Sequence, residues 1–274
     1  MTTASDKRAT FRQLHQSGCF AMPNPWDVGT ARYLQHVGFK AVASTSAGYA
    51  FAQGLPDGAV SRDRMLAHLG ELCAAVAVPV NADFEHGYAD DPGEVAENVR
   101  LCVATGVAGL SIEDSTGRRD QPLYDLDAAV ARVRAARAAI DRAGGDVVFT
   151  ARAECFLVGR PDLDETLRRL KAYAAAGADC LYAPGIRSRE EIAAVVAAVA
   201  PKPVNVLVSS AGGWTVADLA ALGVRRVSVG GALARVAWGA VMRAAKLLLE
   251  SGRFEEFAGA APSPEVNGLF RESR

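Results

Sequence analysis

The sequence has few cysteines, and they follow no recognisable spacing. Five are present among 274 residues, an odd number, and no two form a C-x-x-C pair. A secreted domain held together by disulfides usually carries an even set at regular spacings. We therefore expect reduced, mostly buried thiols at Cys19, Cys73, Cys102, Cys155 and Cys180.

Long apolar runs and an excess of one charge are also missing. No stretch approaches the ~20 apolar residues of a membrane span, and the polar segment from Met1 to Gln16 has no apolar signal core. The formal net charge of -1 and the pI near 6.4 create no long-range field that would gather nucleic acid or an anionic membrane. We therefore expect a cytoplasmic protein whose partner is a small molecule.

The sequence does contain a regular alternation of short apolar runs with longer segments of helical period. Such runs suit strands buried on both faces, and the alternation implies parallel strands joined by helices. A closed barrel of this type commonly has about 250 residues, so we predict an α/β protein with one (β/α)₈ TIM barrel. The eight predicted strands are Cys19 to Met22, Ala41 to Thr45, Val78 to Asp83, Gly109 to Glu113, Val147 to Arg152, Cys180 to Ala183, Val204 to Val208 and Val227 to Gly230.

After the last strand, the segment from Ala232 to Ser251 reads as one long helix rich in Ala and Leu. We assign residues 1–251 to the barrel domain and residues 252–274 to a C-terminal tail. The tail carries Phe254, Phe257 and Phe270, more apolar surface than a free terminus usually retains. We expect the helix or the tail to pack on a partner subunit of a homo-oligomer, a dimer or a tetramer; the alternative is packing on the chain's own barrel.

Acidic residues follow the third and fourth predicted strands. Asp83 and Glu85 come at the end of the third strand, and Glu113 and Asp114 at the end of the fourth. The strand ends of a parallel barrel converge on one mouth, where the reacting groups gather. Several carboxylates with little sulfur or histidine nearby favour a hard cation, Mg²⁺ or Mn²⁺. The alternative for any one of them is a solvated loop residue or a helix cap.

Two further strand ends carry groups suited to anions. Arg152 ends the fifth strand, where its guanidinium could bind a substrate carboxylate through two parallel N–H bonds. The alternative is a salt bridge to Glu113 or Glu154. The second strand ends in Ser44-Thr45-Ser46, whose hydroxyl and backbone N–H groups could hold an anion.

Taken together, these segments resemble the isocitrate lyase/phosphoenolpyruvate mutase superfamily, from about Met22 to Ser251. The resemblance implies that Asp83 binds Mg²⁺ directly and that Glu85 and Glu113 act mainly through metal-bound waters. It implies that Arg152 holds the substrate carboxylate and that Asp57 lies close to the reacting centre. Substrate contacts are implied for Ser44, Thr45, Ser46, Asp83 and Asn205. The segments that carry it are Ser44-Thr45-Ser46, Gly54-Leu55-Pro56-Asp57-Gly58, Asp83-Phe84-Glu85-His86-Gly87-Tyr88, Ile112-Glu113-Asp114 and Ala151-Arg152.

The sequence also departs from this superfamily. Its carbon–carbon lyases have a mobile loop with a cysteine and a histidine after the fourth strand, whereas the segment from Ser115 to Tyr124 contains neither. We expect an atypical, Mg²⁺-dependent member that breaks the bond at C3 of a small α-oxo acid, yields a pyruvate-like enolate, and acts as a carbon–carbon lyase. The alternatives are a hydrolase or mutase acting on phosphonopyruvate or oxaloacetate, and a non-catalytic α-oxo acid binding protein.

Overall fold

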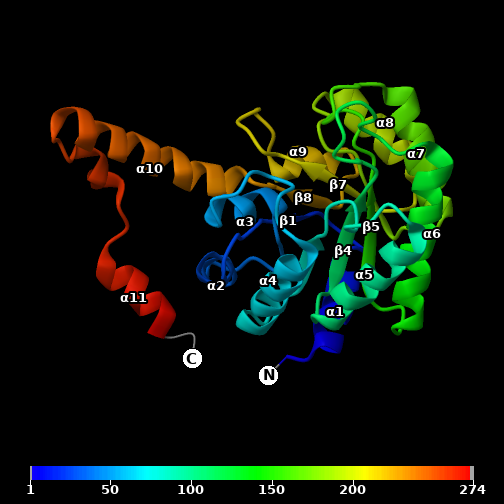
Figure 1. Cartoon of the computed structure of the whole chain (residues 1–274), viewed down its shortest axis with the longest axis horizontal. Helices are drawn as coiled ribbons and strands as arrows, with labels where there is room; N and C mark the ends of the chain where they lie inside the picture. Colours follow the sequence, from blue (N-terminus) through cyan, green and yellow to red (C-terminus); the bar gives the residue numbers. More distant parts are fainter. Residues whose placement is uncertain (1, 272–274) are drawn as a thin grey trace.

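A computed structural model describes residues 2–271 and contains one sheet of eight parallel strands. The hydrogen-bonded order runs β1-β8-β7-β6-β5-β4-β3-β2, so β1 and β2 stand at the two edges. One backbone bond joins those edges, from the Ala43 N–H to the Pro23 carbonyl at 3.0 Å, and the sheet curls into a nearly closed barrel (Figure 1). The TIM-barrel prediction is confirmed. The strands are β1 Phe20–Met22, β2 Val42–Ala43, β3 Val80–Asp83, β4 Gly109–Glu113, β5 Val148–Arg152, β6 Cys180–Tyr182, β7 Val204–Leu207 and β8 Arg226–Ser228.

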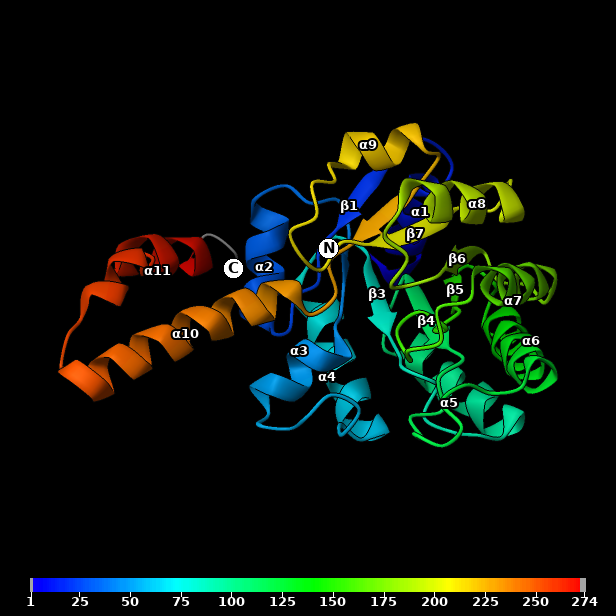
Figure 2. The same cartoon turned by 90° about the horizontal axis from the view of Figure 1, so that it is seen from above.

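Helices alternate with the strands and cover the outside of the barrel (Figure 2). In β4, Leu110 and Ile112 join the apolar core between sheet and helices, while Ser111 faces the barrel interior. The helices are α1 Ala4–Leu14, α2 Val28–His36, α3 Ser46–Ala52, α4 Arg62–Ala75, α5 Pro92–Ala104, α6 Leu126–Arg142, α7 Leu163–Ala175, α8 Arg189–Val199, α9 Val216–Ala221, α10 Ala232–Ser251 and α11 Ser263–Arg271, with a 3₁₀ turn η1 Glu255–Gly259. None of the helices within residues 2–271 combines the length and hydropathy that a membrane span requires.

The first helix, α1, was not predicted, because its sequence is mostly polar. Thr3 caps it reciprocally with Asp6, and Phe11 is its fully buried anchor. The Phe11 ring lies against β4 at Gly109, where a side-chain Cβ would come within 2.5 Å of a ring carbon. A glycine at this strand position thus allows α1 to cover the end of the barrel opposite the strand C-termini.

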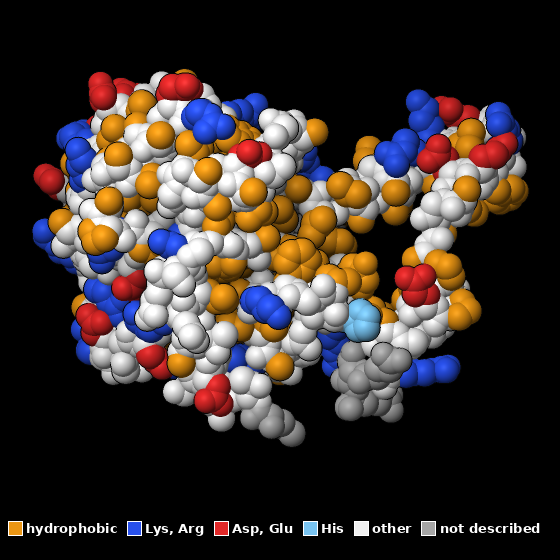
Figure 3. Space-filling view, turned by 180° about the vertical axis from the view of Figure 1, so that it is seen from behind, with side chains coloured by type: hydrophobic (Ala, Val, Ile, Leu, Met, Phe, Trp, Pro, Cys, Tyr) orange, Lys and Arg blue, Asp and Glu red, His pale blue; other side chains and the backbone are white. Residues whose placement is uncertain are grey.

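The C-terminal elements leave the barrel as an arm. The bounds predicted for α10, Ala232 to Ser251, are confirmed, and Ala234 is its one buried residue. Beyond its first turns the helix projects away from the barrel, and the chain returns through η1 to α11, which contacts α2 (Figures 1 and 2). Hydrophobic side chains gather along the inner side of this arm and where it joins the barrel (Figure 3).

Only the predicted strand from Gly109 to Glu113 has the same limits in the structure; the others begin or end one or two residues away from the predicted limits, and two of them differ most. The second is only two residues long, because Thr45 has turned to become the N-cap of α3, accepting a hydrogen bond from the Gly48 N–H. The eighth begins one residue earlier than predicted, at Arg226, and ends at Ser228, because Gly230 adopts a positive φ of 53° in the turn before α10.

Candidate active site

A cavity of about 170 Å³ opens at the carboxyl ends of the strands. Its volume lies below the roughly 300–1,000 Å³ of pockets for drug-sized ligands, so it suits a molecule of a few heavy atoms. Polar side chains from all eight strands or the turns after them line it, and backbone of the turn after β8 completes the wall. Among the predicted site residues it is lined by Ser44, Thr45, Ser46, Asp57, Asp83, Arg152 and Asn205.

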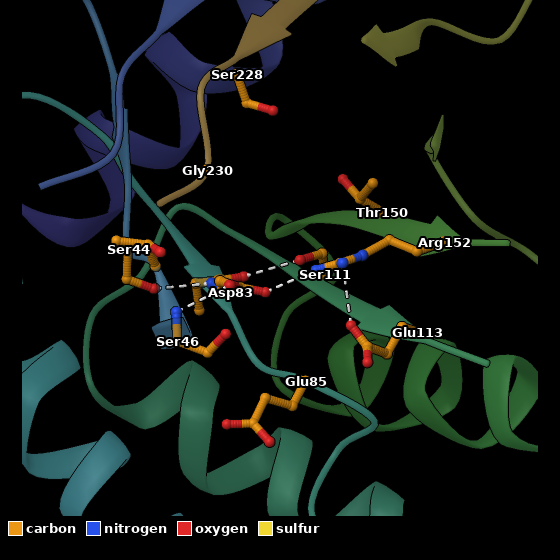
Figure 4. Close-up of polar contacts among 12 residues, drawn as sticks. Ser44, Ser46, Asp83, Glu85, Ser111, Glu113, Thr150, Arg152, Ser228 and Gly230 are labelled. Atoms are coloured by element: carbon orange, nitrogen blue, oxygen red, sulfur yellow. Dashed lines mark hydrogen bonds and ion pairs between the residues drawn. The ribbon is translucent and has the colours of Figure 1, made fainter. Parts of the chain in front are cut away.

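Asp83 is held in place by the turn after β2. Its backbone N–H donates to the Ser44 hydroxyl oxygen at 2.8 Å, and the Ser46 N–H donates to its Oδ2 at 3.0 Å (Figure 4). Ser46 also donates its hydroxyl to Asp57 Oδ1 at 3.2 Å. The serines therefore position two carboxylates at the cavity wall.

Arg152 lies at the centre of the acidic groups. Its Nη1 is 2.8 Å from Asp83 Oδ1, its Nη2 is 3.1 Å from Glu113 Oε2, and its Nε is 2.7 Å from Glu154 Oε1. The side chain is 13% exposed and stacks on the Tyr182 ring, with 5.2 Å from Cζ to the ring centroid. Both interpretations from the sequence are thus compatible, since the guanidinium forms the expected salt bridges and also lines the cavity.

The remaining acids are crowded and partly shielded from water. Burial, together with the Asp83 charge, raises the pKa of Glu85 to about 7 and raises that of Asp57 above its usual range. Burial also raises the pKa of Glu113 well above its usual range in spite of the adjacent Arg152. Glu85 adopts a left-handed φ of 45° and accepts a bond from the Tyr88 hydroxyl at 3.0 Å, to one side of the contacts around Asp83 (Figure 4). The site therefore holds more acidic groups than one guanidinium can pair with, and burial favours the protonated forms of several of them.

The acidic side chains of the site suit a hard divalent cation that one carboxylate binds directly and others contact through water. Within residues 2–271, no three acidic, histidine or cysteine side chains converge closely enough to form a metal cluster. Asp83 lines the cavity, whereas Glu85 and Glu113 do not. Mg²⁺ commonly keeps several waters and takes one or two carboxylates directly. This placement would allow direct binding by Asp83 and contacts through water from Glu85 and Glu113, and an added cation would offset part of the burial and repulsion that raise the pKa values of the two glutamates.

Asp114 has a structural role. It is 3% exposed and accepts hydrogen bonds from Arg169 at 2.9 Å, from the Tyr173 hydroxyl at 2.5 Å and from the Glu154 N–H at 2.8 Å. Glu154 in turn contacts Arg152, so this buried network of hydrogen bonds holds the guanidinium in position.

Sequence reasoning missed several polar residues deeper in the barrel. Asn205, which was predicted, donates from Nδ2 to the Ser228 hydroxyl at 2.9 Å and accepts at Oδ1 from Arg226 at 2.8 Å. Neither of these partners was identified. The position of Ser228 at the end of β8 is a signal that could have marked it, whereas Arg226 lies before the predicted strand and has no local signal that separates it from a solvent-facing arginine. The missed cavity residues are Asn81, Ser111, Tyr182, Arg226 and Ser228.

No residue of the loop after β4, from Ser115 to Tyr124, lines the cavity. Ser115 pairs with Leu123, and Arg118 forms an ion pair with Asp90 at 3.0 Å. Asp90 also accepts a hydrogen bond from Tyr124. Arg118 is exposed and does not line the cavity, so in this arrangement it offers no contact to a phosphonate there.

Comparisons with known proteins agree with this geometry. The family described as phosphoenolpyruvate phosphomutase matches residues 11–249. A crystal structure from Burkholderia cenocepacia J2315, described provisionally as a lyase/mutase, is 51% identical with a TM-score of 0.95 and covers 98% of this chain and 97% of that one. An oxaloacetate decarboxylase of Paraburkholderia xenovorans is 32% identical, over 70% of this chain and 66% of its own. An oxaloacetate acetylhydrolase structure with its product oxalate is 28% identical, with a TM-score of 0.86, covering 99% of this chain and 97% of that one.

Proposed function

Since the chain belongs to the phosphoenolpyruvate mutase family of the isocitrate lyase/phosphoenolpyruvate mutase superfamily, we propose that it is a Mg²⁺-dependent enzyme that breaks the C3 bond of a small α-oxo dicarboxylic acid. The proposed reaction is carbon–carbon cleavage that releases a pyruvate-like enolate. The observation that carries this proposal is the small cavity in which Arg152 and Asp83 lie 2.8 Å apart, one suited to a carboxylate and the other to a cation.

The chain's own residues supply binding and charge compensation. Arg152 would bind the substrate carboxylate with its planar fork, because its buried position and its Glu154 partner hold the guanidinium at the cavity wall. Asn205 and the Ser44 to Ser46 turn would orient the remaining oxygens. Asp83, with Glu85 and Glu113 through water, would hold Mg²⁺ (or Mn²⁺), which polarises the oxo group and stabilises negative charge as it develops.

The missing loop cysteine and histidine favour a reaction that needs no proton transfer during bond cleavage. In decarboxylation of a 2-oxo dicarboxylate, the C3–C4 bonding pair moves onto C3 and the C2 oxygen, CO₂ leaves, and C3 takes a proton afterwards. Stabilisation of the enolate charge is sufficient for that step. Retro-aldol cleavage of a hydroxy acid would also need a base for the hydroxyl proton, and the Ser115 to Tyr124 loop provides no cysteine or histidine for it.

Product analysis separates the candidate functions. We would incubate the protein with Mg²⁺ and oxaloacetate, phosphonopyruvate or methylisocitrate in turn, with Arg152→Met as the control for contaminating activity. Pyruvate and CO₂ from oxaloacetate support the proposal. Oxalate and acetate identify a hydrolase, and phosphoenolpyruvate, or phosphate with pyruvate, from phosphonopyruvate identifies a mutase or hydrolase. Binding of all three acids without turnover identifies a non-catalytic binder and overturns the proposal.

We also propose that the chain is a homo-oligomer in which α10 or the tail packs on a neighbouring subunit. Large apolar side chains on the arm are exposed to an extent unusual for a monomer, including Val236 at 70%, Met242 at 65% and Leu249 at 87%. Exchange of α10 between barrels would bury this surface through a two-fold contact.

A further inference from the structure

Beneath the proposed active site, the barrel encloses an arginine with no acidic partner. Arg226 is 1% exposed and is one of the largest fully buried side chains. Its Nε donates to Asn205 Oδ1 at 2.8 Å, and its Nη2 donates to Thr150 Oγ1 at 3.1 Å. Its Nη1 lies 3.3 Å from His15 Nε2. None of the ion pairs among residues 2–271 includes Arg226, although a buried charge ordinarily has a partner of opposite sign.

The third partner, His15, does not supply the missing negative charge. Its Nδ1 lies 2.7 Å from the Phe11 carbonyl, so that nitrogen carries the proton and Nε2 is free to accept from Arg226. Burial and the Arg226 charge lower the pKa of His15 to about 3. The imidazole is therefore neutral at physiological pH and supplies no negative charge to the guanidinium.

The barrel geometry connects this charge with the cavity. Register pairs join Glu113 to Arg152, Arg152 to Tyr182, Tyr182 to Asn205 and Asn205 to Arg226. This row of inward-facing residues descends from the barrel mouth to its closed end, and Arg226 lines the bottom of the same cavity that Arg152 lines near the top.

We propose that Arg226 is a specificity-determining residue whose unpaired buried charge is compensated by the anionic ligand, so that the site favours dianions over monoanions. The inference rests on the proposed function, since it assumes an anionic α-oxo acid in this cavity. Attraction to a fixed charge is proportional to the charge of the ligand, and few waters screen a guanidinium that is 1% exposed. At a separation of about 10 Å and an effective dielectric of about 20, each unit of ligand charge corresponds to roughly tenfold in affinity.

The test compares two small acids of different charge. Oxalate, a dianion, and pyruvate, a monoanion, are titrated calorimetrically in the presence of Mg²⁺ into the full-length protein and its variants. Arg226→Met removes the charge. We expect the affinity for oxalate to fall by about 100-fold and the affinity for pyruvate to fall by only about tenfold. Arg226→Lys keeps the charge and should keep the preference for oxalate. Arg225→Met is the matched control, because this neighbour is partly exposed and donates to the Gly18 carbonyl instead.

A second variant guards against misfolding of Arg226→Met. His15→Glu places a carboxylate against the guanidinium, leaves Arg226 in position, and should also reduce the preference for oxalate. If both variants bind oxalate and pyruvate more weakly by the same factor, the preference for oxalate is unchanged. Arg226 would then have a merely structural role, and the inference would be overturned. If the wild-type protein binds neither acid, the proposed function fails together with the inference. If it binds both and His15→Glu keeps the wild-type ratio, only the inference fails.

Discussion

The Nη1 atom of Arg152 lies 2.8 Å from Oδ1 of Asp83, so the proposed carboxylate-binding cation directly contacts the proposed metal ligand. The other oxygen of Asp83 accepts from the Ser46 N–H at 3.0 Å. A metal ion on Asp83 must therefore replace or share one of these contacts. If both proposed roles hold, binding of Mg²⁺ and binding of the acid would be linked through one pair of side chains, and each would change the affinity for the other by the same factor.

Replacing Asp83 with alanine should reduce Mg²⁺ affinity by more than about 100-fold, because even outer partners of metal ligands typically contribute roughly 10- to 100-fold. Isothermal titration with MgCl₂ measures the change. Asp164→Ala, which removes a carboxylate from the first turn of α7, is the control and should titrate like the wild type. Unchanged affinity in Asp83→Ala would remove this residue from the metal site.

Substituting lysine for Arg152 should weaken oxalate binding by about tenfold to 100-fold, although the charge is kept. Lysine lacks the planar fork that contacts three carboxylates at 2.7 to 3.1 Å and that would bind an acid through two parallel bonds. Titration with oxalate in the presence of Mg²⁺ tests this. Arg168→Lys, at an exposed position on α7, is the control. Equal affinity in Arg152→Lys and the wild type would exclude a bidentate contact.

The strands and the mouth of the site were predictable because their signals are local. An apolar run followed by acids defined Gly109 to Glu113 correctly, and glycines at both ends defined α10. Local signals could not reveal Arg226, because an arginine in a strand has the same sequence signature whether it faces solvent or the barrel interior. Its burial depends on the register of β8 against β7, which is a property of the closed sheet. The coverage of the barrel end by α1 likewise depends on one distant contact, between Phe11 and Gly109.

Acid stability should depend on His68, a buried residue outside the site. Burial lowers its pKa to about 4, against about 6.5 in an unfolded chain. The unfolded state therefore binds more protons between these values, so the contribution of His68 to stability is complete above pH 6.5 and declines as the pH falls toward 4. Its Nε2 has no hydrogen-bond partner among residues 2–271, and its ring stacks on Tyr49 with 3.8 Å between the ring centroids.

His68→Phe keeps this stacking and removes the titration. Between pH 7 and pH 5, we expect the free energy of unfolding to fall less in His68→Phe than in the wild type, with a difference on the order of 1–2 kcal/mol. Urea unfolding at the two pH values measures the difference, with the exposed His36→Gln as control. His15 continues to titrate in both proteins, so some acid lability remains. Identical losses in His68→Phe and the wild type would show that His68 does not contribute.

The proposed oligomer can be tested at the α10 arm. Trp238 is 45% exposed and lines an apolar depression together with Phe51 and Leu55 from the segment after β2. Because this surface lies where α10 leaves the barrel, a charge there should oppose any packing of the helix on a second barrel. Trp238→Glu should therefore lower the apparent molar mass in light scattering toward 28.7 kDa and lower the melting temperature, since assembly stabilises the fold. Lys246→Glu, on the same helix at a side-chain exposure of 73%, is the matched control and should remain assembled.

Truncation after Gly231 removes the arm and should abolish soluble protein. The oligomer proposal would be abandoned if the full-length protein stayed monomeric at micromolar concentration with an intact thermal transition.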